Sequence, residues 1–592
     1  MWSRSRSKNC SPGATPSSGR WGSTKLEERA AAWVAEPAPP GLDALIAAGH
    51  SPGFAALLAR RGATDPDSAA RFLSPSLDQL HDPLGLAGMA EAVDRLVAAR
   101  EAKQKVAIVG DYDVDGVTAT AQLLAVFSAC GIEAQAILPH RLRDGYGFQA
   151  AQVERALQAG CGLIVTADCG SSSIPAIEAA TAAGLDVLVT DHHLPGGPLP
   201  AGTIQVNPRQ AGCGYPFPDL AAAGIAFKFS LALGQRLGRA LPVEALLRIA
   251  CLGTIADLVP LRGENRVIAA LGLKALESSR SPGLKALIRQ AGMKTPYSAS
   301  DIGFRIGPRL NAAGRLAEAD PALEILMSRD EKRAIELAVQ LDGWNRERQT
   351  EEALVVEQAQ AQAQERADRL GRPPAIFILW SPEWHRGVVG IAAGRIARIW
   401  NRPTLLLAVE GETATGSGRS VPGIALHGFL APWKERLLRF GGHAQALGLS
   451  ADLGCLPALR EEWEEAADGA FAPEMLVRSH TYELEAAPGE IDIAFLDRLS
   501  HLAPFGQGNP QPVVRVGPLE LAAAPRFFGT DHLSARAREP AGGTLNLVGW
   551  GWQPRADDLL GRFEALGTLD LDRFLGEPVM RLIDARPEGS NR

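Results

Sequence analysis

Three short apolar segments of the chain each end in residues that can bind metal ions. Magnesium and manganese ions prefer carboxylate oxygens, and a histidine nitrogen suits manganese better than magnesium. Because so many carboxylates in one crevice would repel each other, the pattern predicts a site for two divalent ions and phosphoryl-transfer chemistry. The residues are Asp111, Asp113 and Asp115 after VAIVG, Asp168 after LIVTA, and Asp191, His192 and His193 after DVLVT.

Each of these residues also has a simpler interpretation. If the segment DYDVDG is extended, Asp111, Asp113 and Asp115 project to one side, but one of the three could instead cap the next helix. Asp168 alone could equally be a cap. His193 could bond a phosphate oxygen or move a proton. The alternative is that both histidines lie in a surface turn.

The segments that must position these residues alternate between strand and helix patterns. From Val106 onward, short apolar runs alternate with helix-like stretches, which predicts βαβ units and a parallel sheet. Gly131, Gly160 and Gly184 are placed as helix C-terminal glycines. In open α/β sheets ligands bind at the carboxyl ends of the strands. The predicted fold class is therefore α/β, with the acidic residues gathered at that edge.

The rest of the chain divides into further units. A long Glu-, Gln- and Arg-rich stretch without proline predicts a connecting helix between two domains. A second α/β pattern follows it, and strand-like segments near the C-terminus predict a small β-barrel. The predicted units are a disordered tail at 1–27, a catalytic α/β domain with N-terminal helices at 42–328, the connecting helix at 329–371, a smaller α/β domain at 372–465 and the barrel at 475–592.

Composition excludes several classes of protein. No apolar run approaches the roughly 18 residues of a membrane span, so no membrane association is expected. The seven scattered cysteines form no Cys-x-x-Cys pair, which indicates a reducing, cytoplasmic setting without a zinc module or disulfide framework. No Gly-Lys pair occurs, so a Walker A motif is excluded. The net charge of −7 counts slightly against nucleic-acid binding. It is a weak guide, because binding depends on local basic grooves and not on the net charge.

Basic and glycine-rich segments nevertheless suggest contacts to a nucleic-acid backbone. Ser417 and Arg419 lie in GSGRS, where a loop could bring amides and a guanidinium against a phosphate; an ordinary hairpin turn is the alternative. Arg309 and Arg315, in GPRLNAAGR, could follow a nucleic-acid backbone, and Arg141 in PHRLRDGYG is a further candidate. Aromatic residues could stack on bases or pack in the core. They are Tyr146, Phe148, Phe527, Phe528, Trp550 and Trp552.

These motifs resemble a known superfamily when they are taken in order. GDYDVDG, TADCG, VTDHH and GTIADLVPL resemble the successive motifs of the DHH phosphoesterases. RIGPRLNAAGRL, LDGWNRERQ, WHRGVVGIAAGRIA, GSGRS, GGHAQALG and PFGQGNPQPV together resemble the RecJ family, the single-strand-specific 5′→3′ exonucleases of bacteria. The resemblance extends from about Leu42 to the C-terminus. It implies a DHH catalytic domain, a DHHA1-type second domain and a C-terminal OB-fold.

The resemblance also implies roles for individual residues. Asp257 joins the metal ligands, while His193 and Asp111 are catalytic: His193 faces the scissile phosphate, and Asp111 supports or joins the metal site. Ser417 and Arg419 would form a 5′-phosphate pocket, and His443 would contact the substrate. The implied metal ligands are Asp113, Asp115, Asp168, Asp191, His192 and Asp257.

The expected function is metal-dependent degradation of single-stranded DNA, in DNA repair and recombination. The expected cofactors are two Mn²⁺ or Mg²⁺ ions. A single-stranded DNA-binding protein and a RecQ-type helicase are expected partners of a monomer. Two alternatives stay open. The same site could act as a pyrophosphatase, oligoribonuclease or cyclic-dinucleotide phosphodiesterase, or the chain could be an inactive DNA-binding scaffold.

Overall fold

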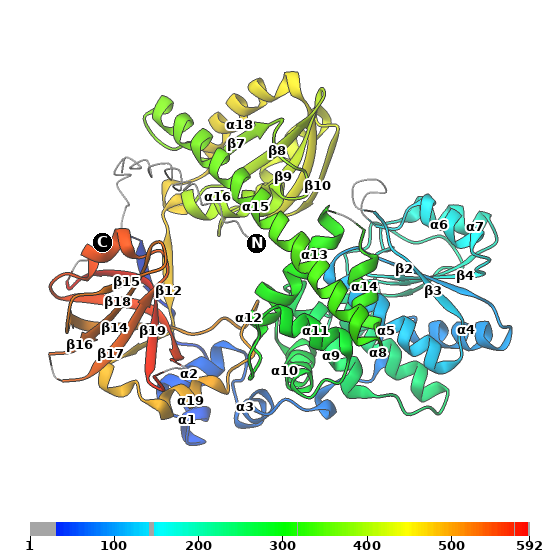
Figure 1. Cartoon of the computed structure of the whole chain (residues 1–592), viewed down its shortest axis with the longest axis horizontal. Coiled ribbons are helices and arrows are strands. Elements are labelled where there is room, and N and C mark those ends of the chain that lie inside the picture. Colours follow the sequence, from blue (N-terminus) through cyan, green and yellow to red (C-terminus); the bar gives the residue numbers. More distant parts are fainter. Residues whose placement is uncertain (1–30, 141–146, 317, 541, 573–574, 590–592) are drawn as a thin grey trace, which may run out of the picture.

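The protein consists of two α/β domains and a β-barrel (Figure 1). The computed structural model describes residues 31–589, except 141–146, 317, 541 and 573–574. The predicted disordered tail therefore lies outside the described residues. None of the described helices is long and apolar enough to span a membrane.

The first domain contains a five-stranded sheet in which every strand pairs in parallel. The central strands are apolar and buried along their whole length, as expected for a parallel sheet with both faces covered. This arrangement confirms the predicted βαβ pattern. In spatial order the strands are β3 (Ala134–Ile137), β2 (Val106–Gly110), β4 (Leu163–Ala167), β5 (Asp186–Thr190) and β6 (Ile204–Val206).

Helices cover both faces of this sheet and extend beyond it. Helix α5 (Val114–Cys130), which follows β2, packs closely against α8 (Ala222–Arg236) and α9 (Val243–Ala256). The start of α8 brings backbone amides to the edge of the sheet, and the end of α9 brings Asp257. The helices are α4 (Met89–Glu101), α5 (Val114–Cys130), α6 (Ala150–Gln158), α7 (Ile174–Ala182), α8 (Ala222–Arg236), α9 (Val243–Ala256), α10 (Gly263–Glu277), α11 (Pro282–Gln290), α12 (Ala299–Asp301), α13 (Gly307–Leu316) and α14 (Asp320–Met327).

The predicted connecting helix is present as α15 (Glu331–Leu370). Its 40 residues correspond to a length of about 60 Å. Its first half packs Leu337 and Leu341 into the core of the first domain, whereas Val355 and Ala359 pack against the second sheet. The helix therefore belongs to both α/β domains and fixes their separation.

The second domain is built on a five-stranded mixed sheet. Helices α15 and α16 cover one face of it, and α17 and α18 cover the other. In spatial order the strands are β10 (Arg439–His443), β11 (Ala446–Asp452), β9 (Thr413–Arg419), β8 (Thr404–Glu410) and β7 (Phe377–Ser381), with α16 (Val389–Trp400), α17 (Leu426–Leu430) and α18 (Leu456–Ala470).

The C-terminal domain is the predicted barrel. Pairing between β14 and β16 closes a sheet in the order β14-β18-β19-β17-β16, and β13 and β15 extend it. The elements are β13 (Leu484–Ala486), α19 (Ile493–Ser500), β14 (Val513–Leu521), β15 (Arg526–Phe528), β16 (His532–Arg538), β17 (Thr544–Gly549), β18 (Phe563–Leu571) and β19 (Pro578–Pro587).

The N-terminal helices share a hydrophobic core with the barrel. The apolar side chains of α1 (Leu42–Ala47), α2 (Pro52–Arg60) and α3 (Pro66–Leu73) share one buried cluster with barrel residues. The strand β1 (Ala32–Ala35) also pairs with β12 (Ser479–Tyr482), just before the barrel. The expected grouping of residues 42–328 in one domain is corrected here, because these helices complete the core of the barrel.

Candidate metal centre and phosphate pocket

The structure brings seven of the predicted site residues together at the carboxyl edge of the first sheet. They form three groups of ligand atoms, and within each group the atoms lie within 4.8 Å of one another. The loops after β2, β4 and β5 carry most of them, and the C-terminus of α9 carries one. The groups are Asp168, His192 and His193; Asp115, His192 and Asp257; and Asp111, Asp113 and Asp168.

The first acidic motif is not extended, and one of its three aspartates caps the next helix, which was the alternative considered above. Asp113 is the N-cap of α5, and its Oδ1 accepts hydrogen bonds from the amides of Asp115 and Gly116. Asp115 lies in the first turn of that helix, where its two carboxylate oxygens accept bonds from the amides of Ala222 and Ala223 at the start of α8. Two helix N-termini therefore hold these carboxylates in place.

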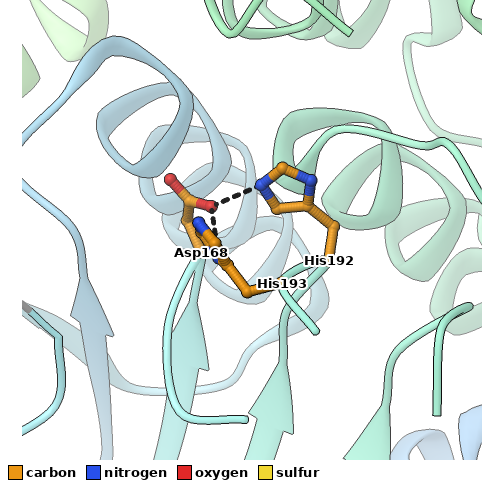
Figure 2. A group of neighbouring side chains, drawn as sticks. All are labelled: Asp168, His192 and His193. Carbon is orange, nitrogen blue, oxygen red and sulfur yellow. Dashed lines mark ion pairs between the residues drawn. The ribbon is translucent and has the colours of Figure 1, made fainter. Parts of the chain in front are cut away.

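Three buried polar atoms at the centre of the site have no hydrogen-bond partner among the described residues. They are Asp168 Oδ1 and both ring nitrogens of His192. His192 Nε2 lies 3.1 Å from Asp168 Oδ1 (Figure 2), 3.7 Å from Asp257 Oδ2 and 3.8 Å from Asp115 Oδ2. Two ligands at right angles on one ion, each about 2.1 Å from it, lie about 3 Å apart. The residues therefore fit a divalent cation.

The titration of these groups indicates the same need for positive charge. Burial and the charge of Asp113 raise the pKa of Asp115 to about 7. Burial and the charges of Asp115 and Asp113 raise the pKa of Asp257 to about 9, and the pKa of Asp168 lies well above its usual value for the same reasons. Burial lowers the pKa of His192 to about 3, so its ring is neutral and can act as a ligand.

Asp191 occupies a different position from the other acids. Its Oδ1 accepts bonds from the amides of His192 and His193, and its Oδ2 accepts one from the amide of Ser171. His193 Nδ1 also lies 2.8 Å from Asp191 Oδ1. Asp191 is in none of the three ligand groups among the described residues. The geometry therefore favours an orienting role for Asp191, where the sequence predicted a metal ligand.

The charge of Asp191 also affects the ring of His193. Burial lowers the pKa of His193, but the hydrogen bond and charge of Asp191 and the charges of Asp111 and Asp113 raise it by more. In turn, burial raises the pKa of Asp191, whereas the bond and charge of His193 reduce it to about 2. The two residues thus form an ion pair in which the Nδ1–H of His193 donates to the carboxylate.

Two asparagines were missed by sequence reasoning. Asn207 is fully buried just after β6, and its Nδ2 donates to Ser171 Oγ and to the carbonyl of His193. Asn311, in α13, accepts a hydrogen bond from the amide of Val114 at the start of α5. The strand-end pattern that identified the aspartates also marks Asn207. No local signal relates Asn311 to α5.

The segment GSGRS lies in a strand up to Arg419 and is not a loop or hairpin turn, which corrects the expectation for it. Ser417 and Arg419 alternate with glycines in β9, between β8 and β11. A Cβ at Gly416 would lie 1.9 Å from the carbonyl oxygen of Leu406, so the glycines permit close strand packing. Ser417 Oγ and Arg419 Nη2 lie 3.1 and 3.2 Å from the Cβ position of Gly390, in the first turn of α16. The hydroxyl of Ser417 and the guanidinium of Arg419 therefore lie beside the N-terminus of α16.

The other predicted nucleic-acid contacts have different outcomes. Arg315 Nη1 donates to the carbonyl of Gly387, so α13 contacts the segment that leads into α16. Arg309 is paired with Asp342 of α15 at 2.8 Å. His443 is exposed at the end of β10. Arg141 and Tyr146 lie outside the described residues.

The aromatic candidates separate into core and surface residues. Phe148 is 1% exposed and Trp552 4%, so both are core. Phe527, Phe528 and Trp550 are 51%, 39% and 61% exposed on the barrel.

Comparisons with protein families match all three domains. Residues 105–254 match the N-terminal domain of the DHH family, residues 374–468 the DHHA1 domain and residues 482–583 the RecJ OB domain.

The same relationship appears with whole proteins. The chain is 35% identical to a single-stranded-DNA-specific exonuclease RecJ of Dickeya dadantii, over 86% of this chain and 92% of that protein. It is 38% identical to that of Bacillus subtilis, over 79% of this chain but 58% of that longer relative. The crystal structure of RecJ from Thermus thermophilus in complex with Mn²⁺ superimposes with a TM-score of 0.79 and 29% identity, over 94% and 79% of the two chains. The chain therefore belongs to the RecJ family of single-stranded-DNA-specific exonucleases.

Proposed function

We propose that the protein removes 5′-mononucleotides from the 5′ end of single-stranded DNA by metal-dependent hydrolysis, in DNA repair and recombination. The observation that carries the proposal is the cluster of ligand atoms around Asp168 Oδ1 and His192 Nε2, two buried atoms without a hydrogen-bond partner in the part of the chain that the structure describes. Family membership supports the choice of single-stranded DNA as the substrate.

Two divalent cations, Mn²⁺ or Mg²⁺, would be held by residues of the three groups. Such ions supply charge neutralisation at a phosphate and activation of water. One ion would be held by Asp115, His192 and Asp257, and the other by Asp111 and Asp113. Asp168, which shares a group with Asp111 and Asp113 and lies 3.1 Å from His192, would contribute a further carboxylate oxygen. The neutral ring of His192 offers a lone pair, which favours Mn²⁺.

The residues around the start of α16 support attack at the 5′ end. Arg419 and Ser417 would bind the terminal phosphate, together with amides of the first turn of α16. Arg315 connects this pocket, through α13 and Asn311, to the start of the helix that carries Asp113. A strand held by its terminal phosphate would present its first phosphodiester bond to the metal centre. The product would then be a 5′-mononucleotide.

His193 would act on the scissile phosphate. Asp191 fixes the ring through Nδ1, so Nε2 points away from Asp191 and can donate to a phosphate oxygen or move a proton. The hydrogen bond and charge of Asp191 raise the pKa of His193, which favours the protonated ring that this role requires.

The cellular setting rests on family membership alone. A single-stranded DNA-binding protein and a RecQ-type helicase would supply the substrate strand, and the protein would act as a cytoplasmic monomer. His443 and Arg309 are proposed to contact the strand. In the structure, however, the guanidinium of Arg309 is bonded to Asp342 and would need to exchange that partner.

Digestion of end-labelled DNA tests the proposal. Single- and double-stranded oligonucleotides, labelled at either end, would be incubated with Mn²⁺, Mg²⁺ or EDTA. The expected result is release of labelled mononucleotide from the 5′ end of single strands only, and only with metal. Release first from the 3′ end, or cleavage in EDTA, would contradict the proposal.

Asp168→Asn is the matched inactive variant. Asp168 has φ +69°, a left-handed conformation that asparagine also tolerates, so the variant should fold. It removes a carboxylate charge from both metal positions and should abolish cleavage. Asp186→Asn, at the opposite and exposed end of β5, is the control and should leave activity unchanged. Near-normal cleavage by Asp168→Asn with Mn²⁺ present would refute the metal assignment.

A further inference from the structure

The loop that carries Asp257 has an unusual backbone. Asp257 ends α9, and Leu258 follows with φ +60° and a side chain that is 67% exposed. A non-glycine residue persists in the left-handed region only when its surroundings hold it there. Contacts from outside the segment between Asp257 and the start of α10 at Gly263 must therefore hold its backbone in place.

A turn of the barrel domain contacts this segment directly. The amide of Leu261 donates to the carbonyl of Gln507 at 2.7 Å, and Arg262 Nε donates to the carbonyl of Gly508 at 2.6 Å. Both acceptors lie in PFGQGNP, a segment almost 250 residues later in the chain. The main chain of one domain thus binds the loop of a proposed metal ligand in another.

The two glycines of the turn allow this close approach. A Cβ at Gly506 would lie 2.7 Å from Leu261 Cδ1, and a Cβ at Gly508 would lie 2.9 Å from Pro260 Cβ. Gly508 also has φ +70°, which side chains rarely adopt. A side chain at Gly508 would therefore push the loop and the turn apart, and one at Gly506 would displace the buried side chain of Leu261.

The turn itself is rigidly held. Gly506 and Asn509 exchange two backbone hydrogen bonds, and the fully buried Asn509 Nδ2 donates to the carbonyls of Leu502 and Pro504. Asn509 Oδ1 accepts from Arg61 Nε, and the buried Arg61 guanidinium is paired with the half-buried Glu483 at 2.8 Å. The turn can therefore act as a fixed support for the loop.

We infer that the turn Phe505–Pro510 positions Asp257, so that the barrel helps to build the metal centre and does not serve only to hold the strand. The inference rests on the proposed metal centre. Asp257 is 3.7 Å from His192 Nε2, and a shift of its loop by a fraction of an ångström would change that separation. Gly506, Gly508 and Arg262 are positioning residues, because they act through Asp257.

Mn²⁺ binding to the full-length protein without DNA tests the inference. Arg262 is exposed, so Arg262→Ala should fold while losing one contact to the turn. One hydrogen bond of ordinary strength corresponds to a roughly 2- to 10-fold weaker affinity for Mn²⁺. Gly508→Ala, which displaces Pro260 as well, should weaken binding further. Affinity and stoichiometry would be measured by calorimetry and by the electron paramagnetic resonance of unbound Mn²⁺.

Two further variants distinguish failure of the positioning role from failure of the metal assignment. Arg236→Ala removes an exposed arginine of α8 whose Nε bonds Asp94 at 2.8 Å; it is the matched control and should bind Mn²⁺ like the unmodified protein. Asp257→Asn should lose one ion. If Asp257→Asn weakens Mn²⁺ binding while Arg262→Ala and Gly508→Ala do not, the positioning role of the turn is refuted and the proposed metal centre stands. If Asp257→Asn also binds normally, the metal centre is wrongly assigned and the inference fails with it.

Discussion

Replacement of Asp191 by asparagine is the most informative single change at the site. The carboxylate is 1% exposed and accepts four hydrogen bonds, from the amides of Ser171, His192 and His193 and from His193 Nδ1. Asparagine keeps the shape but offers one oxygen and one NH₂ group. The oxygen best occupies the Oδ1 position, where three donors converge, and the NH₂ group then faces the amide of Ser171.

The magnitude follows from these contacts. A buried donor left without its acceptor costs about 1–3 kcal/mol, so the free energy of unfolding should fall by that amount. The loss of a charge-assisted bond to His193, about 1.5–3 kcal/mol, corresponds to a roughly 10- to 150-fold lower kcat. The pKa of His193 should also fall, because Asp191 no longer raises it.

The assay is the pH dependence of kcat on a 5′-phosphorylated single strand with saturating Mn²⁺. If the protonated ring donates to the phosphate, kcat declines as the pH rises through the pKa of His193, and in Asp191→Asn this decline should begin at lower pH. Asp186→Asn, on the same strand but exposed, is the control. Stability would be followed by urea unfolding.

Two results would refute the orienting role. A kcat within two-fold of the unmodified protein, with an unshifted pH profile, would show that Asp191 does not fix His193. A loss of one bound Mn²⁺ in Asp191→Asn would instead make Asp191 a metal ligand, as the sequence predicted.

Two further predictions concern the pocket and the metal-free protein. Arg419→Ala should reduce the preference for 5′-phosphorylated over 5′-hydroxyl ends by about 10- to 150-fold, since a charge-assisted bond is lost. An unchanged ratio of kcat/KM for the two ends would show that Arg419 does not bind the 5′ phosphate. In EDTA the folded protein should become less stable as the pH rises from about 4 to about 9, because folded Asp257 retains a proton that the unfolded chain releases. Urea unfolding at several pH values checks this, and Asp257→Asn or added Mn²⁺ should flatten the dependence.

Local patterns were enough to predict the edge of the first sheet. Alternating apolar strands and helices bring strand ends together, so Asp111, Asp168 and His192 could be grouped before the fold was known. The course of DYDVDG could not be predicted in the same way. Its acidic residues suit either a strand or a helix start, and only the packing of α5 against α8 decides for the cap at Asp113.

Long-range packing accounts for the other differences. The glycines of GSGRS suggested a loop, but Gly416 serves the close approach of β9 to β8. The helices at 42–73 carry ordinary apolar faces, which contain no information about the domain that they cover. Their association with a barrel more than 400 residues later is visible only in the folded chain.

The hydrogen bonds that hold Asp113 and Asp115 have a consequence for the order of assembly. Amides at the starts of α5 and α8 already neutralise part of the charge of these two carboxylates, so the chain can bring its acidic residues together before any cation arrives. We therefore expect the chain to fold before it binds metal, at a cost in stability that grows with pH as the remaining buried acids lose their protons.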